Sequence, residues 1–126
     1  MKPILYVFIG SAMGGVLRYG LANFFYYHLG RSFPWGTLIV NIIGCFLIGL
    51  TFTLIVEKFH HHSLLLHNLL ITGFLGGFTT FSAFSFESFA LFESMMLLRG
   101  FIYLFVSVIG CLIFTAVGVW LGKIIS

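Results

Sequence analysis

A polar run interrupts one of the apolar stretches of this sequence. Residues 73–87 read GFLGGFTTFSAFSFE, with two adjacent glycines and two adjacent threonines. Phe81 and Phe84 are three positions apart and share a helical face, with Ser82 and Ser85 beside them. Aromatic rings are positive at their edges, so ring edges along a narrow dehydrated path would attract a small anion. Packing within a core is the alternative for such a Phe pair.

Two polar residues share one face of the segment 35–56. Thr37 and Asn41 are four residues apart, which places one above the other on a helix. The Asn41 amide lies among Ile, Val and Leu residues. It can hydrogen-bond a neighbouring helix, or it can donate to a passing anion. The sequence leaves both interpretations open.

A stripe of hydroxyl and thiol groups follows the last apolar segment. Its members recur every four residues, at Tyr103, Ser107, Cys111 and Thr115. A single Ser or Thr often bonds back to its own helix. Three hydroxyls in register, facing a similar face on another helix, indicate the lining of a pore.

Two charged residues lie well inside apolar segments. Arg18 follows a long apolar run and either snorkels to the lipid headgroups or anchors nearby carbonyl groups. Glu87 lies on roughly the same helical face as Thr80 and Phe84. It is either a titratable group at a pore mouth or the partner of an Arg or Tyr. The chain has no nucleophile–base set, metal-ligand spacing or phosphate-binding loop, so we do not expect an enzyme.

The helices that position these residues are predicted to cross a membrane. The chain of 126 residues is 60% hydrophobic and only 7% charged, a composition that a soluble core of this size could not absorb. Since a span needs about 20 apolar residues, we expect one all-α membrane domain over residues 1–126. Its four spans are predicted at about 4–27, 35–56, 68–98 and 101–121. The net charge of +3 is spread along the chain, so nucleic-acid binding is not supported.

The third segment is too long for one straight membrane helix. At 31 residues it would reach about 46 Å, against a hydrocarbon core of about 30 Å. This excess and the Gly76-Gly77 pair predict two helical pieces, with a break near residues 76–80. Backbone freed in hydrocarbon must be satisfied by protein or water, so such a break typically marks a binding site or a conduction path.

Glycine spacing and charge distribution predict how the spans pair. GxxxG spacing occurs at Gly10-Gly14, Gly73-Gly77 and Gly118-Gly122, and it lets helix backbones approach closely. Basic residues barely distinguish the two sides of the membrane. One side would carry Lys2, Lys58 and Lys123, and the other Arg31 and Arg99. This near balance permits an antiparallel homodimer.

Other polar residues have plainer interpretations. Cys45 and Cys111 fall inside predicted spans, where we expect small packing residues and no disulfide. The run His60-His61-His62 lies in the polar connection 57–67 and is predicted to be a solvated or headgroup-level loop rather than a metal site.

Three motifs together resemble the fluoride channel family (Fluc/CrcB). They are GGVLRY at residues 14–19, WGTLIVNIIG at 35–44 and GFLGGFTTFSAF at 73–84. The resemblance implies a small dual-topology homodimer in the bacterial inner membrane. Such a dimer has two antiparallel pores, exports fluoride passively from the cytoplasm and holds a central structural sodium ion.

The resemblance also implies roles for individual residues. Phe81 and Phe84 match an aromatic box whose ring edges face fluoride, and Asn41 matches a pore-lining amide. Backbone carbonyls of Gly76 and Thr79 match the sodium ligands, and Arg18 matches the arginine of the first span. The remaining fluoride-pore residues are Thr37, Thr80, Ser82, Tyr103, Ser107, Thr115 and Glu87.

The chain departs from the family pattern at two positions. Ala83 stands where the family commonly has Thr, and Cys111 stands where the stripe would have a hydroxyl. Two other functions are possible for four small spans. A multidrug-type proton-coupled transporter needs a membrane-embedded carboxylate, ideally in the first span, where this chain has Arg18. A non-transporting subunit of a membrane complex would leave the hydroxyl stripe and the Phe pair without a purpose.

Overall fold

The computed structural model describes residues 1–126, except that the side chain of His60, in the histidine run, lies outside the described part. Its elements are α1 (Lys2–Leu29), α2 (Trp35–Lys58), the 3-10 turn η1 (His60–His62), α3 (Ser63–Leu66), the π-type turns η2 (His67–Leu75), α4 (Gly76–Phe78), α5 (Phe81–Glu93) and α6 (Leu97–Ile125). Within the described residues, four helical stretches are long and apolar enough to cross a membrane: Lys2–Leu29, Trp35–Lys58, Ser63–Glu93 and Leu97–Ile125. This confirms the prediction of an all-helical chain with four membrane-length helices.

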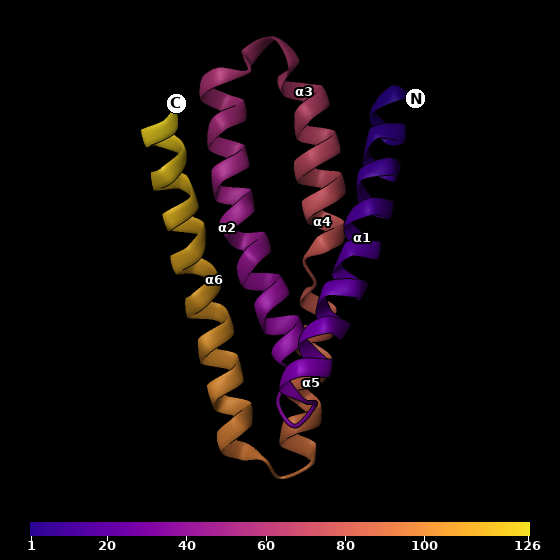
Figure 1. Cartoon of the computed structure of the whole chain (residues 1–126), viewed down its shortest axis with the longest axis vertical. Coiled ribbons are helices and arrows are strands. Elements are labelled where there is room, and N and C mark those ends of the chain that lie inside the picture. Colours follow the sequence, from indigo (N-terminus) through magenta and orange to yellow (C-terminus); the bar gives the residue numbers. More distant parts are fainter.

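The helices run the length of an elongated bundle (Figure 1). Both termini and the connection between α2 and α3 lie at one end, and the other two connections lie at the opposite end (Figure 1). Consequently α2 and α6 run in the same direction, and they pack along each other while α1 packs against η2 and α4. Lys2, Lys58 and Lys123 fall at the first end, and Arg31 and Arg99 at the second.

Glycines bring two pairs of helices to backbone contact. A Cβ added at Gly14 of α1 would lie 2.0 Å from the Phe74 carbonyl oxygen of η2. A Cβ at Gly118 of α6 would lie 2.2 Å from the Phe46 carbonyl oxygen of α2. No side chain fits at either position, so the close approach that the GxxxG spacing predicts is present in both pairs.

Two residues between α4 and α5 leave the helical conformation. Thr79 has φ −83° and ψ 156°, and Thr80 has φ −148° and ψ 116°. Gly76, by contrast, is helical, with φ −63° and ψ −37°. Within the predicted interval 76–80, the extended residues are therefore the two threonines, whereas Gly76 stays helical. β-Branched side chains favour extended backbone, which agrees with this placement.

The turn between the last two membrane-length helices begins earlier than hydropathy indicates. The Met95 N–H donates to the Phe92 carbonyl (3.0 Å), and the Met96 N–H donates to the Leu91 carbonyl (2.9 Å). Met95 has a positive φ of 60°, which reverses the chain. Residues 97 and 98 thus belong to α6 and not to the third segment. Hydropathy could not place this turn because Met and Leu continue the apolar run through it.

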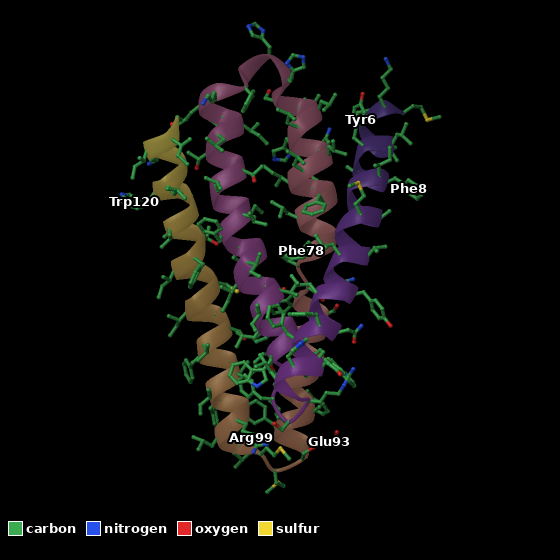
Figure 2. All side chains as sticks on the ribbon, in the orientation of Figure 1. Tyr6, Phe8, Phe78, Glu93, Arg99 and Trp120 are labelled. Carbon is green, nitrogen blue, oxygen red and sulfur yellow. The ribbon has the colours of Figure 1, made fainter. Side chains whose placement is uncertain are left out.

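The interior is small and the surface is apolar. Figure 2 shows Phe78 in the middle of the bundle, whereas Phe8 and Trp120 point away from it. Phe78 is 2% exposed, against 69% for Phe8 and 64% for Trp120. Large apolar side chains on the outer face suit a lipid environment. One buried cluster lies between α2, α5 and α6 and contains Leu38, Phe84 and Tyr103.

Candidate functional site

The Asn41 side chain of α2 holds the extended backbone at Thr80. Its Nδ2 donates to the Thr80 carbonyl oxygen (3.0 Å), and its Oδ1 accepts from the Thr80 N–H (2.8 Å). The amide therefore satisfies both backbone groups of a residue that has left the helix, as the apolar setting requires. This is the first of the two interpretations of Asn41. An Asn amide has a second N–H, so the bond to Thr80 does not exhaust its donors.

Thr80 also begins the next helix. Its Oγ1 accepts from the Ala83 N–H (3.2 Å), which caps the N-terminus of α5. The Ser82 hydroxyl lies 3.2 Å from the same oxygen. Because the first turn of a helix carries a partial positive charge, the region around Thr80 favours an anion.

A cavity of about 240 Å³, here the central cavity, lies beside this helix start. Its lining consists of amide, hydroxyl, thiol and aromatic groups and one aliphatic side chain, from Asn41, Cys45, Thr79, Thr80, Phe81, Phe84, Ser107, Val108 and Cys111. Ser107 is 5% exposed, and its hydroxyl has no hydrogen-bond partner among the described residues. Because a buried hydroxyl without a partner is costly, this donor is available to a ligand.

The two phenylalanines of the predicted box lie at this cavity but in different environments. Their ring centroids are 5.5 Å apart with planes at 53°. Phe84 is 7% exposed and contacts Tyr103, with centroids 5.3 Å apart. Phe81 is 78% exposed in the single chain. One ring is thus fixed in the core, and the other lies on the outer face.

Four helices meet at the Glu87 carboxylate of α5. Oε1 accepts from the Thr37 hydroxyl of α2 (2.7 Å) and the Tyr26 hydroxyl of α1 (3.0 Å). Oε2 accepts from the Tyr103 hydroxyl of α6 (2.8 Å). We call Tyr26, Thr37, Glu87 and Tyr103 the Glu87 cluster. Of the two interpretations of Glu87, the tyrosine-partnered carboxylate is the one present.

Sequence reasoning missed Tyr26. The adjacent Tyr27 offers an equivalent hydroxyl at almost the same depth, and only the packing of α1 shows which ring faces inward. Tyr27 is 87% exposed, whereas the Tyr26 hydroxyl also lies 3.2 Å from the Thr37 hydroxyl. The Arg31 guanidinium lies 4.9 Å from the centroid of the Tyr26 ring, a cation–π distance.

A second cavity of about 340 Å³ connects the Glu87 cluster to the end of the bundle. Tyr26, Arg31 and Glu87 line it together with residues of the turn after α5. A basic side chain at this mouth would raise the local concentration of anions. From the sequence, Arg31 was expected only to contribute to the orientation of the chain in the membrane.

Several predicted residues lie outside the central cavity lining. Thr115 is half-buried and donates back to the Cys111 carbonyl of its own helix (2.9 Å). Arg18 is half-buried on α1, and Gly76 is exposed. Cys111 and Cys45, expected only to pack, are free thiols that line the central cavity.

Two backbone carbonyl groups, at Gly76 and Thr79, suit a cation. In an uninterrupted helix the Thr80 N–H would bond the Gly76 carbonyl, and the Ala83 N–H would bond the Thr79 carbonyl. Here the first donates to Asn41 and the second to the Thr80 hydroxyl. The carbonyls of Gly76 and Thr79 lose their helical donors, and carbonyl oxygens of this kind are ligands for Na⁺. The residues present therefore fit the expected ion.

Known proteins are similar to this sequence over most of its length. A relative from Hahella chejuensis named "Fluoride-specific ion channel FluC" is 43% identical over 122 residues, covering 97% of this chain and 95% of the relative. Proteins of the same name from Coxiella burnetii and Rhizobium etli are 43% and 51% identical over 123 and 108 residues. They cover 98% and 86% of this chain, and 96% and 86% of their own lengths. These names describe ion channels and not enzymes.

The family described as "CrcB-like protein, Camphor Resistance (CrcB)" matches residues 5–119. The matched region contains the central cavity and the Glu87 cluster. This agrees with the resemblance identified from the three sequence motifs, and the chain belongs to the CrcB family.

Proposed function

We propose that this protein is a fluoride-selective channel and that the central cavity is part of its conduction path. The observation that carries the proposal is the buried Ser107 hydroxyl, which lines the cavity with Asn41 and Phe84 and has no hydrogen-bond partner among the described residues. The relatives named fluoride-specific channels support the same function.

The chemistry of the cavity suits a small, strongly hydrated anion. A pore must replace the water that the ion loses, and hydroxyl and amide N–H groups supply hydrogen bonds while ring edges supply partial positive charge. Because Coulomb attraction weakens with distance, such donors stabilise a small anion more than a larger one such as chloride. The N-terminus of α5 adds a favourable field at Thr80.

The proposed working unit is an antiparallel homodimer with two pores. Phe81 is 78% exposed and Phe86 73%, and Phe81 lines the central cavity. A single chain would therefore expose its anion path to lipid, which a second copy packed on this face would prevent. The ends of the bundle carry three and two basic residues, so both orientations can insert.

A structural sodium ion on the dimer axis is part of the proposal. Gly76 and Thr79 of each chain would hold it through their carbonyl oxygens, which have lost their helical donors. When bound, the ion supplies a fixed positive charge that favours anions in the nearby pores. We place the channel in the bacterial inner membrane, where it lets fluoride leave the cytoplasm down its gradient.

Liposome efflux tests the conduction proposal. Vesicles containing the purified protein are loaded with fluoride or chloride, and release is followed with ion-selective electrodes. We expect rapid fluoride loss and negligible chloride loss. Phe81→Ile should abolish fluoride release, whereas the matched change Phe8→Ile, on the outer face of α1, should not. Retention of fluoride by wild-type vesicles would contradict the proposal.

A labelling experiment tests the dual topology separately. A cysteine tag after Ser126, in a chain whose two native cysteines are alanine, is exposed to a membrane-impermeant maleimide in intact cells. About half of the tags should react from outside and the rest only after lysis. Reaction from one face alone would refute dual topology and leave the efflux result unaffected.

A further inference from the structure

Two cysteines line the central cavity from neighbouring helices. Cys45 lies one turn after Asn41 on α2, and Cys111 lies one turn after Ser107 on α6. The two helices run in the same direction and pack along each other (Figure 1). Both are free, half-buried and part of the cavity lining.

The surroundings of the pair are polar on one side. The Thr115 hydroxyl lies one turn from Cys111 and donates to its carbonyl oxygen (2.9 Å). The unpartnered Ser107 hydroxyl lines the same cavity one turn away. The two sulfur atoms thus border an open space in the protein rather than a filled packing contact.

Two thiols suit only certain metals. Thiolate sulfur is a soft ligand that selects soft cations. Among the described residues, no group of three or more His, Cys, Asp or Glu side chains could hold a metal together. Zinc takes four ligands in structural sites, and two cysteines do not provide them. A soft cation with linear coordination by two sulfur ligands matches the cysteine pair.

We propose that Cys45 and Cys111 form a two-thiolate site for a soft divalent cation, with Hg²⁺ as the representative ion. On binding, each thiol loses its proton to water, two metal–sulfur bonds form and no atom changes oxidation state. The complex of Hg²⁺ with two thiolates is neutral. With Ag⁺ the same two thiolates would leave a net negative charge in an apolar interior, which is costly.

A metal at this site would obstruct the central cavity. Cys111 and Cys45 share its lining with Asn41 and Phe84. Fluoride conduction should therefore fall when the site is filled. This consequence rests on the proposed function, whereas the metal site itself does not.

Mercury stoichiometry tests the site directly. The purified protein is titrated with Hg²⁺, and intact mass and ultraviolet absorption of the mercury–sulfur bonds are recorded. We expect one Hg per chain, with a mass gain of one Hg less two protons, because the chain has two cysteines in all. Cys45→Ser and Cys111→Ser should each bind Hg²⁺ at least a hundredfold more weakly against a competing small thiol. Alanine at either position serves if a serine variant does not fold.

Two results would contradict the proposed metal site. Binding of two Hg per wild-type chain would mean that the thiols react separately. Single variants that retain Hg²⁺ as firmly as the wild type would mean the same. Zinc is the matched control and should not compete.

Efflux with and without Hg²⁺ tests the consequence. Hg²⁺ should reduce wild-type fluoride release at least tenfold and leave the Cys45→Ser, Cys111→Ser double variant at its own metal-free rate. Equal inhibition of both proteins would refute the block. Absence of fluoride release from wild-type vesicles before metal is added would contradict the channel proposal instead, while the stoichiometry would still decide the metal site.

Discussion

The central cavity and the Glu87 cluster are built from the same two helix faces but use their hydroxyls differently. In the cluster, Thr37 and Tyr103 both donate to the Glu87 carboxylate. One turn along the same helices, Ser107 donates to nothing among the described residues, and Asn41 holds the backbone of Thr80. The two regions therefore differ in free hydrogen-bond donors rather than in the number of polar side chains. The central cavity has a donor left for an anion, whereas the donors of the cluster already bind the Glu87 carboxylate.

The register of α2 and α6 explains why the two regions are adjacent. The helices run in the same direction, so residues separated by one turn on α2 face residues separated by one turn on α6 (Figure 1). Thr37 and Tyr103 accordingly share the Glu87 carboxylate, and Asn41 and Ser107 share the lining of the central cavity. The difference comes from α5, which presents a carboxylate at one level and its N-terminus at the other. The first region is expected to stabilise the bundle and the second to carry the ion.

Among the changes that compare the two regions, Asn41→Asp has the largest expected effect, because it would place a fixed negative charge beside the central cavity. It keeps the acceptor for the Thr80 N–H, removes the donor to the Thr80 carbonyl and repels anions. We expect fluoride efflux from liposomes to fall at least roughly a hundredfold, equivalent to about 2.7 kcal/mol in the barrier.

Asn68→Asp is the matched control for this change. Asn68 lies in η2 and lines neither the central cavity nor the second cavity at Arg31. The Asn68→Asp protein should conduct at nearly the wild-type rate. Wild-type efflux in Asn41→Asp would remove the central cavity from the conduction path.

Glu87→Gln should act mainly on stability. The neutral amide offers one acceptor oxygen in place of two, so Tyr103, Thr37 and Tyr26 can no longer all donate. Hydrogen bonds to charged groups contribute about 1.5–3 kcal/mol each, and neutral ones about 0.5–1.5 kcal/mol. We expect a loss of about 3 kcal/mol in the free energy of unfolding, measured by denaturation in detergent.

The exposed Glu93 provides the comparison for Glu87. It is the last residue of α5, and Glu93→Gln should change the unfolding free energy by less than about 0.5 kcal/mol. A Glu87→Gln protein as stable as Glu93→Gln would show that the Glu87 cluster does not hold the four helices together.

The contrast also shows how much of the candidate site can be predicted from the spacing of residues in the sequence. Four-residue spacing on α2 and α6 identified the faces that carry Asn41 and Ser107, and three-residue spacing placed Phe81 beside Phe84. Spacing defines the face of a helix but not its neighbour. The extended angles at Thr80 depend on an amide 39 residues away, so local glycines were a poor guide to them.

Ser107→Ala should have the opposite signature to Glu87→Gln. The hydroxyl has no hydrogen-bond partner in the described part of the chain, so its removal should leave the unfolding free energy unchanged or slightly raised. If the hydroxyl solvates fluoride, the efflux rate should fall about tenfold, equivalent to about 1.4 kcal/mol. Ser88→Ala is the matched control, because Ser88 is also 5% exposed but donates to the Phe84 carbonyl (2.7 Å). Lower stability with unchanged efflux in Ser107→Ala would assign this residue a structural role.

Tyr26→Phe should have the smallest effect and marks the border between the two regions. The change removes one of the two hydroxyls that donate to Glu87 Oε1 and keeps the ring under the Arg31 guanidinium. Since Thr37 still donates to that oxygen, we expect a loss of about 1 kcal/mol in the free energy of unfolding and a change in efflux of less than about threefold. Tyr27→Phe, one residue along and 87% exposed, should change neither. An efflux loss in Tyr26→Phe as large as that of Asn41→Asp, with stability retained, would extend the ion path through the Glu87 cluster to the cavity at Arg31. The carboxylate would then exchange its donors with the passing anion rather than hold them permanently.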